Sequence, residues 1–152
     1  MTLPADIVGT PMPVVQAIID RERLRSFAES TGETAPHYLE LDAAHALGYP
    51  DLPAPPTFLF GLGLDPHGPF GWLERIGVPV ERILHAGQGF VYHQLAFAGD
   101  EIELQPRVVD CYRKRDGALE FLVIETTATR AGEAIALLRE TLVLRHAEAT
   151  AK

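Results

Sequence analysis

Cysteine is almost absent from this sequence, since Cys111 is the only one in 152 residues. A single cysteine cannot form an internal disulfide, and the first residues lack the basic start and apolar core of a secretory leader. No apolar run approaches the roughly 18 residues that a membrane-spanning helix needs. We therefore expect a protein of the reducing cytoplasm that does not cross a membrane, with Cys111 in a structural role.

Basic residues are also scarce. Lysine and arginine number 13 against 21 aspartate and glutamate residues, which gives a net charge of -8. An acidic chain is repelled by phosphate backbones at long range, so a nucleic-acid partner is not expected. One basic cluster remains, formed by Arg113, Lys114 and Arg115. Such a cluster is typical of a charged hairpin end, and the alternative is a contact with the phosphate groups of an anionic ligand.

Several kinds of catalytic site have no counterpart in the sequence. No spacing of cysteine and histidine resembles a zinc site. Ser26 and Ser30 do not lie in a nucleophile elbow, and no glycine loop has the pattern that cradles phosphates. His85 and His93 would lie about 26 Å apart along a continuous strand, so they could not share a metal ion. Neither a metal ion nor a cofactor is expected.

The second half of the chain has the period of two that a half-buried strand requires. Four such segments occupy residues 85–97, 101–113, 119–130 and 134–145, with glycine turns between them. Short turns between consecutive strands predict an antiparallel meander. Pro106 cannot donate a hydrogen bond to a neighbouring strand, so we expect a bulge or a sheet edge at that residue.

The first half begins with a strand and two short helices. Residues 13–20 predict the strand. Asp20 is placed to cap a helix over residues 21–31, which Gly32 is placed to end. Asp42 is placed to cap the second helix.

A third helix is expected to form the centre of the fold. It can begin near Pro55 or Pro56, because proline is tolerated in a first helical turn, and it is apolar almost all round. Such a helix must be buried, and the strands that follow can bury it by curling around it. Residues 65–82 predict an irregular excursion before the strands. The sequence therefore predicts one α+β domain over residues 1–152 with the hot-dog architecture.

Three stretches resemble the MaoC-like hydratase/dehydratases, and most of all their N-terminal-type domain, which is not catalytic by itself. The stretches are FAESTGETAPHYLELDAAHALGYPDLPAPPTFLF, LHAGQGFVYHQLAFAGDEI and ETTATRAGEAIALLRETLVLR. The resemblance implies a hot-dog fold and CoA or acyl-carrier thioesters as substrates. It also implies reversible hydration of a 2-enoyl group to a (3R)-hydroxyacyl group, without a cofactor.

Active members of that family carry Gly-Asp-x-Asn-Pro-x-His. Hydration of an enoyl thioester needs a base for the water and an acid for C2, and a carboxylate and an imidazole beside one water can share these tasks. In this chain the aspartate position is Glu33, the asparagine position Ala35 and the histidine position Tyr38. A tyrosine with a pKa of about 10 is a poor base near neutral pH. The resemblance therefore implies that the standard pair is missing.

A displaced pair, Glu33 with His37, is the alternative source of acid and base. In an extended segment His37 would point to the side opposite Tyr38. The resemblance also implies that backbone N–H groups at the start of the central helix stabilise the thioester oxygen. Since prolines lack an N–H, these donors would come from Ala54, Thr57 or a neighbouring loop.

Three functions stay open on these grounds. The first is a dehydratase subunit that shapes the acyl pocket and receives Asp and His from a MaoC-like partner. The second is a self-sufficient homodimeric hydratase, and the third is a binding module for acyl thioesters without catalysis. A thioesterase is less favoured because the central helix offers no acid before Asp65. We expect an oligomer in each case, and an acyl pocket whose length depends on the packing of Phe58, Phe60, Phe70 and Trp72.

Overall fold

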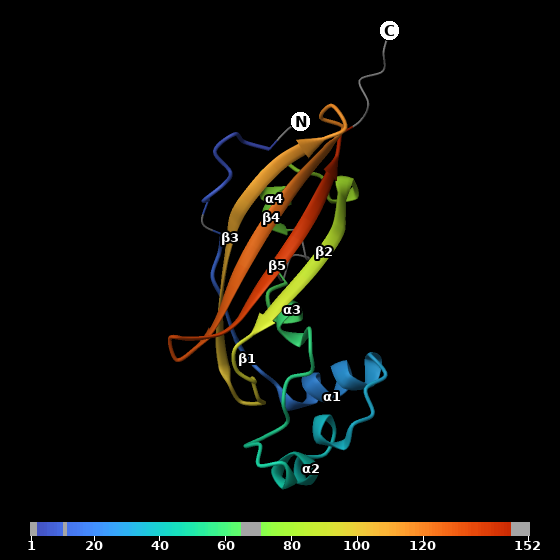
Figure 1. Ribbon diagram of the computed structural model, residues 1–152, viewed down its shortest axis with the longest axis vertical. Helices are drawn as coiled ribbons and strands as arrows, with labels where there is room; N and C mark the ends of the chain where they lie inside the picture. Colours follow the sequence, from blue (N-terminus) through green and yellow to red (C-terminus); the bar gives the residue numbers. More distant parts are fainter. Residues whose placement is uncertain (1–2, 11, 65–70, 147–152) are drawn as a thin grey trace.

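A curved, five-stranded antiparallel sheet wraps around a short central helix (Figure 1). The computed structural model describes residues 3–10, 12–64 and 71–146. The strands are β1 (Val15–Ile18), β2 (Ile83–Tyr92), β3 (Glu101–Lys114), β4 (Leu119–Arg130) and β5 (Glu133–Arg145). The helices are α1 (Arg21–Ser30), η1 (Pro36–Tyr38), α2 (Leu41–Ala46), α3 (Phe58–Leu62), α4 (Gly71–Arg75) and η2 (Val80–Arg82). The predicted α+β hot-dog fold is confirmed.

The strand order corrects the predicted meander. The order is β1-β3-β4-β5-β2, so β3, β4 and β5 form consecutive hairpins while β2 pairs with β5. Residues 93–100, which link β2 to β3, do not form a tight turn. They are hydrogen-bonded to the segment before α3 instead. Ala54 N donates to Ala96 O at 2.8 Å, and Ala98 N donates to Leu52 O at 2.9 Å. These bonds lead the chain across the end of the sheet, which leaves β1 and β2 as its two edges.

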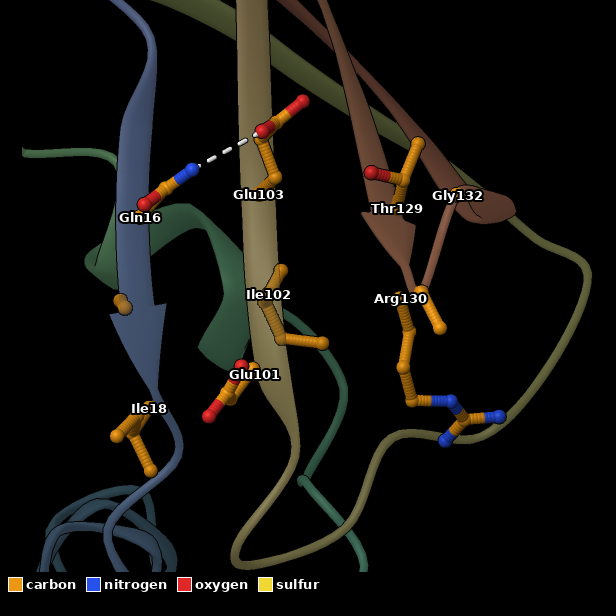
Figure 2. A pocket seen from close by; sticks show the side chains of 10 residues that line it. Gln16, Ile18, Glu101, Ile102, Glu103, Thr129, Arg130 and Gly132 are labelled. Atoms are coloured by element: carbon orange, nitrogen blue, oxygen red, sulfur yellow. Dashed lines mark hydrogen bonds between the residues drawn. The ribbon is translucent and has the colours of Figure 1, made fainter.

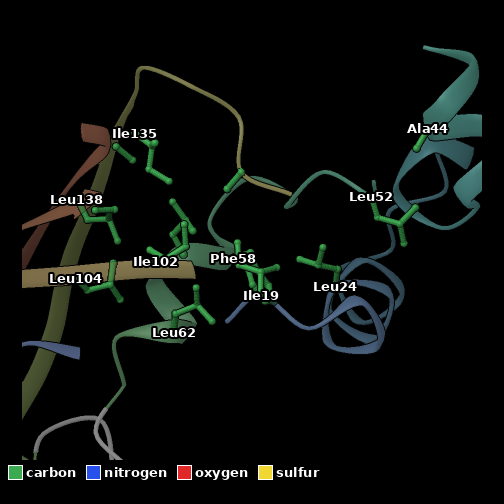
Figure 3. Close-up of a cluster of buried hydrophobic side chains, with 14 residues drawn as sticks. Ile19, Leu24, Ala44, Leu52, Phe58, Leu62, Ile102, Leu104, Ile135 and Leu138 are labelled. Atoms are coloured by element: carbon green, nitrogen blue, oxygen red, sulfur yellow. The ribbon is translucent and has the colours of Figure 1, made fainter. Parts of the chain in front are cut away.

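The central helix α3 begins later than the predicted start near Pro55 or Pro56. Thr57 precedes it with a φ of 72°, in the left-handed region, so the helix starts at Phe58. Phe58, Leu59 and Leu62 are buried in it. Figure 3 shows Phe58 and Leu62 among core side chains from α1 and the sheet, which include Leu24, Ile102 and Leu138. An apolar helix is therefore buried by the strands that follow it, as the sequence predicted.

The first helix has the predicted ends, and the second does not have the predicted cap. Asp20 Oδ1 accepts a hydrogen bond from Arg23 N at 2.9 Å, and Gly32 adopts a φ of 74° where α1 ends. Asp42, however, lies inside the first turn of α2, which begins at Leu41. The carboxylate of Asp42 therefore does not cap α2, although its charge lies near the positive end of the helix dipole.

At Pro106 the sheet-edge alternative is found, and the bulge lies further along β3. Pro106 lies beyond the short β1 pairing, on a stretch where β3 is paired with β4 alone among the described strands. A shift of register between Val108 and Asp110 interrupts the period of two. Cys111 therefore packs against the core in place of Tyr112, and burial raises the pKa of its thiol.

Residues 65–82 are less irregular than expected, because α4 and η2 lie within them. Asp65 and Phe70 lie outside the described residues. Asp65 was the first acid after the central helix in the sequence, and Phe70 was one of the residues expected to set the length of the acyl pocket. Among the residues that are described, no helix has the length and apolar character needed to cross a membrane.

Candidate functional site

One oxygen of the Glu33 carboxylate is hydrogen-bonded within the loop that follows α1. The Oε1 atom of Glu33 accepts hydrogen bonds from Thr34 N at 2.9 Å and from Ala35 N at 2.8 Å. Pro36 then begins the single turn of 3-10 helix η1. The carboxylate of Glu33 thus satisfies backbone donors that would otherwise be exposed at the start of that turn. These two bonds fix the shape of the loop before η1.

His37 and Tyr38 lie side by side, which corrects the expectation for an extended segment. Their ring centroids are 4.3 Å apart at an angle of 40°, because η1 is helical and successive side chains do not alternate. The ring of Tyr49 lies 6.2 Å from that of His37. Among the described residues, no hydrogen bond or ion pair joins His37 to Glu33. The structure therefore brings the two candidates into one loop without joining them as a pair.

Tyr38, at the position of the family's histidine, cannot replace it as a base. Burial raises the pKa of the Tyr38 phenol, and the neighbouring Glu33 carboxylate and Tyr49 raise it further. The phenol therefore keeps its proton at neutral pH. It can donate a hydrogen bond, but it cannot accept a proton from water at a useful rate.

Both predicted backbone donors at the start of α3 already have acceptors. The N–H of Ala54 is bonded to Ala96 O, and Thr57 N donates to the hydroxyl oxygen of Tyr92 at 2.9 Å. Phe58 N donates to Pro55 O at 3.1 Å. Tyr92 is 45% exposed, so a ligand can displace its hydroxyl group more easily than it can displace a backbone carbonyl. Of the two candidates, Thr57 is therefore the donor that a ligand could reach.

Sequence reasoning did not identify Tyr92. This residue ends β2, and 35 positions separate it from Thr57. Only the pairing of β2 with β5, which the predicted meander did not contain, carries its hydroxyl to the start of α3. The stacked ring of Phe90, 5.7 Å away and nearly parallel, holds the Tyr92 ring on the same strand. No local pattern in the sequence could have signalled this contact.

The basic cluster is divided among three different environments. Arg113 Nε is bonded to Glu120 at 2.9 Å, and Lys114 Nζ lies 5.4 Å from the centre of the Tyr112 ring. Arg115 lies in the β3–β4 turn with a φ of 53°. Figure 1 shows that turn at the end of the sheet opposite α1 and α2. A contact between these residues and the phosphates of CoA remains a prediction.

An open groove of about 680 Å³ lies at the β1 edge of the sheet (Figure 2). Gln16 Nε2 donates to the Glu103 carboxylate at 3.2 Å, and the Arg130 guanidinium is bonded to Asp100 at 2.6 Å. The described residues that line the groove include none of the predicted site residues. In the described part of the chain, no three histidine, cysteine or acidic side chains form a metal site either. The predicted site residues outside the basic cluster lie elsewhere, in the loop that contains η1 and at the start of α3.

Known proteins resemble this chain over most of its length. The sequence profile of the FAS1-like dehydratase domain region matches residues 6–138. The UPF0336 protein of Saccharopolyspora erythraea is 32% identical over 147 residues, which cover 95% of this chain and 93% of that protein.

Solved structures agree with the sequence matches. The HadBC (3R)-hydroxyacyl-ACP dehydratase complex of Mycobacterium tuberculosis has a chain 26% identical to this one, with a TM-score of 0.79. The match covers 93% of this chain and 99% of that one. A MaoC-like dehydratase is 25% identical, with a TM-score of 0.77, over 94% of this chain and 43% of that one. The chain belongs to the family of the FAS1-like dehydratase domain region, and with it to the MaoC-like hot-dog dehydratases.

Proposed function

We propose that this chain is one subunit of a (3R)-hydroxyacyl thioester dehydratase, which also acts as a 2-enoyl-CoA hydratase in reverse. In this proposal the chain shapes the acyl pocket, and a MaoC-like partner chain supplies the catalytic Asp and His. The observation that carries the proposal is the state of the two family positions. Glu33 is bonded to the backbone of its own loop, and Tyr38 holds a proton that burial makes harder to remove.

The open edge of the sheet supports a partner chain. In the described part of the chain β2 is hydrogen-bonded on one side, to β5. Leu84 and Val91 on this strand are 47% and 55% exposed. An open edge strand with exposed apolar side chains favours pairing with a second chain. The similar HadBC dehydratase is itself a complex of two kinds of chain, which supports a heteromeric pair here.

The substrate would be a thioester of CoA or of an acyl-carrier protein. Adding or removing water requires only two proton transfers and stabilisation of the thioester oxygen, so the proposal includes no cofactor. Thr57 N–H, at the start of α3, would donate to that oxygen after the Tyr92 hydroxyl has moved away. Phe58, directly after it, would form part of the wall of the acyl pocket. We place this reaction in the cytoplasm.

Reconstitution tests the proposal. The purified chain should hydrate crotonyl-CoA no faster than background. Addition of a MaoC-like chain that carries Gly-Asp-x-Asn-Pro-x-His should produce a complex larger than the 16.7 kDa chain by light scattering, and activity should appear with it. Robust turnover by the chain alone would instead favour a homodimer that uses Glu33 and His37. Thioester binding without turnover under any pairing would favour a binding module.

The bond between Thr57 and Tyr92 gives a second test. Tyr92→Phe removes the acceptor that a thioester oxygen would have to displace, so we expect acyl-thioester binding to the assembled enzyme to tighten about 3- to 10-fold. Calorimetric titration with a non-hydrating acyl-CoA measures this change. Tyr112→Phe is the matched control, because the Tyr112 ring stacks on Phe121, away from α3. Weaker binding by Tyr92→Phe would mean that the hydroxyl binds the substrate itself.

A further inference from the structure

A second cavity lies inside the fold, between α3 and the sheet. Its volume is about 70 Å³, several times the roughly 10–15 Å³ that one water molecule requires. Leu59 and Phe60 of α3 and Trp72 of α4 form part of its apolar wall. Three polar side chains also line it, Gln88, Thr126 and Glu140. The cavity therefore has an apolar side and a polar side.

Glu140 stands on the core face of β5. Side chains two positions apart on a strand point to the same face, and Leu138 and Leu142 are both buried in the core. Glu140 lies between them and faces Gln88 of β2 and Ile124 of β4 in the sheet register. The side chain of Glu140 is only 19% exposed. A carboxylate thus occupies a position where the strand pattern would otherwise place an apolar residue.

Few interactions offset the desolvation of the buried Glu140 carboxylate. Burial raises the pKa of Glu140, and the partner that the described residues provide is the ring of His85, whose Nε2 lies 3.6 Å from Oε1. His85 Nε2 also lies 3.3 Å from Gln88 Oε1, so this nitrogen is shared. By contrast, the buried Glu120 has three hydrogen-bonding partners. A buried carboxylate with this one partner is expected to lower stability rather than to raise it, so stability does not explain the acid.

The cavity lies within reach of the start of α3. Leu59 and Phe60 follow Thr57 by two and three residues, which is about 3–5 Å along a helix axis at a rise of about 1.5 Å per residue. An acyl chain whose carbonyl oxygen accepts from Thr57 N–H would therefore reach the cavity after a few carbons. Its remote end would meet Glu140, Gln88 and Thr126.

We propose that this cavity is the far end of the acyl pocket, and that Glu140, with Gln88 and Thr126, binds a hydroxyl group on the acyl chain. The inference rests on the proposed thioester function and narrows its substrate class to chains with a remote hydrogen-bond donor. A carboxylate can accept a hydrogen bond from a hydroxyl group. A plain alkyl end would shield Glu140 from water without offering a hydrogen bond in return. Sites built to bind a hydroxyl reject analogues that lack it far more strongly than apolar pockets reject an extra methylene.

The single tryptophan of the chain makes this test direct, because Trp72 lines the cavity. The full chain is titrated with hexanoyl-CoA and 6-hydroxyhexanoyl-CoA, and Trp72 fluorescence is followed. We expect the hydroxylated thioester to bind about tenfold more tightly, the effect of one charge-assisted hydrogen bond. Glu140→Leu should reverse this preference, while Glu140→Gln, which can still bond to a hydroxyl, should retain part of it. Glu125→Gln, on the neighbouring strand and paired with Arg139, is the matched control and should change nothing.

Thermal melts of the same variants test whether Glu140 has a purely structural role. Because Glu140 is buried with little compensation, Glu140→Leu should melt at a higher temperature than the parent chain. A lower melting temperature would show that Glu140 serves the fold, and would overturn the inference. Equal affinities for the two thioesters would overturn it too, while leaving the proposed function intact. If neither thioester bound to the chain, the inference would fall, while activity on reconstitution with the partner chain would still decide the proposed function.

Discussion

Replacing Glu33 by Gln or His37 by Ala is expected to leave the hydration rate of the reconstituted enzyme within about twofold of the parent rate. Replacing the partner's Asp or His should lower that rate by about 10²-fold or more, the usual cost of losing a general acid or base. The contrast follows from the geometry of the loop. Glu33 is bonded to Thr34 N and Ala35 N, and in the described part of the chain no bond links it to His37.

Steady-state rates with crotonyl-CoA at saturating partner concentration measure these effects. Tyr38→His in the isolated chain is a useful control, because it restores the family's imidazole without freeing the Glu33 carboxylate. It should not create activity. Loss of turnover on His37→Ala, with the complex still assembled, would show that this chain contributes its own base and that the proposal is wrong.

Removal of the Glu120 carboxylate should lower the free energy of unfolding more than removal of the Glu125 carboxylate on the same strand. Glu120 is 2% exposed, and its oxygens accept hydrogen bonds from Leu3 N at 3.1 Å and Arg113 Nε at 2.9 Å, while His146 Nε2 lies 3.0 Å away. Breaking a buried ion pair by removing one partner costs about 3–5 kcal/mol. Because Arg113 is half exposed and can return to water, we expect Glu120→Ala to cost about 3 kcal/mol. For a chain of this size that lowers the melting temperature by roughly 6–12 °C.

The same cluster predicts a dependence of stability on pH. Burial alone would raise the pKa of Glu120, but the hydrogen bonds from Leu3, Arg113 and His146 together hold it below its ordinary value of 4.5. A carboxyl group with a lowered pKa in the folded state stabilises the fold above its unfolded pKa. This contribution is lost as the pH falls below about 4.5 and through the lower folded value. The free energy of unfolding should therefore decrease over that range in the parent chain.

Chemical denaturation at several pH values measures both effects. Glu120→Ala should lose less stability than the parent chain between neutral pH and pH values below about 4.5, because it lacks the group that is protonated. Glu125→Ala on the same strand is the control. Its partners Arg107 and Arg139 are largely exposed, so it should cost less than about 1 kcal/mol. An equal loss of stability in the two variants would show that the Glu120 cluster stabilises the fold no more than the exposed ion pairs of Glu125 do.

Features that depend on neighbouring residues could be predicted from the sequence alone. Asp20 and Gly32 set the ends of α1, because a cap bonds within its own turn and a left-handed residue favours glycine. The turns between β3, β4 and β5 could also be predicted, since each contains a glycine between two segments in which apolar and polar residues alternate. The loss of the family's asparagine and histidine at Ala35 and Tyr38 needed only the resemblance.

Features that depend on pairing between distant segments were decided by the tertiary structure. The sequence did not place β2 beside β5, and this pairing brings the Tyr92 hydroxyl to Thr57 N–H and Gln88 opposite Glu140. A one-residue shift in β3 exchanged Cys111 for Tyr112 on the core face. The sequence of this chain determined the ends of α1, the central hairpins and the departure from the family motif at Ala35 and Tyr38, because each of these depends on residues close together along the chain. Only the tertiary structure decided which groups line the pocket, because strand register fixes the face and the neighbour of every side chain at once.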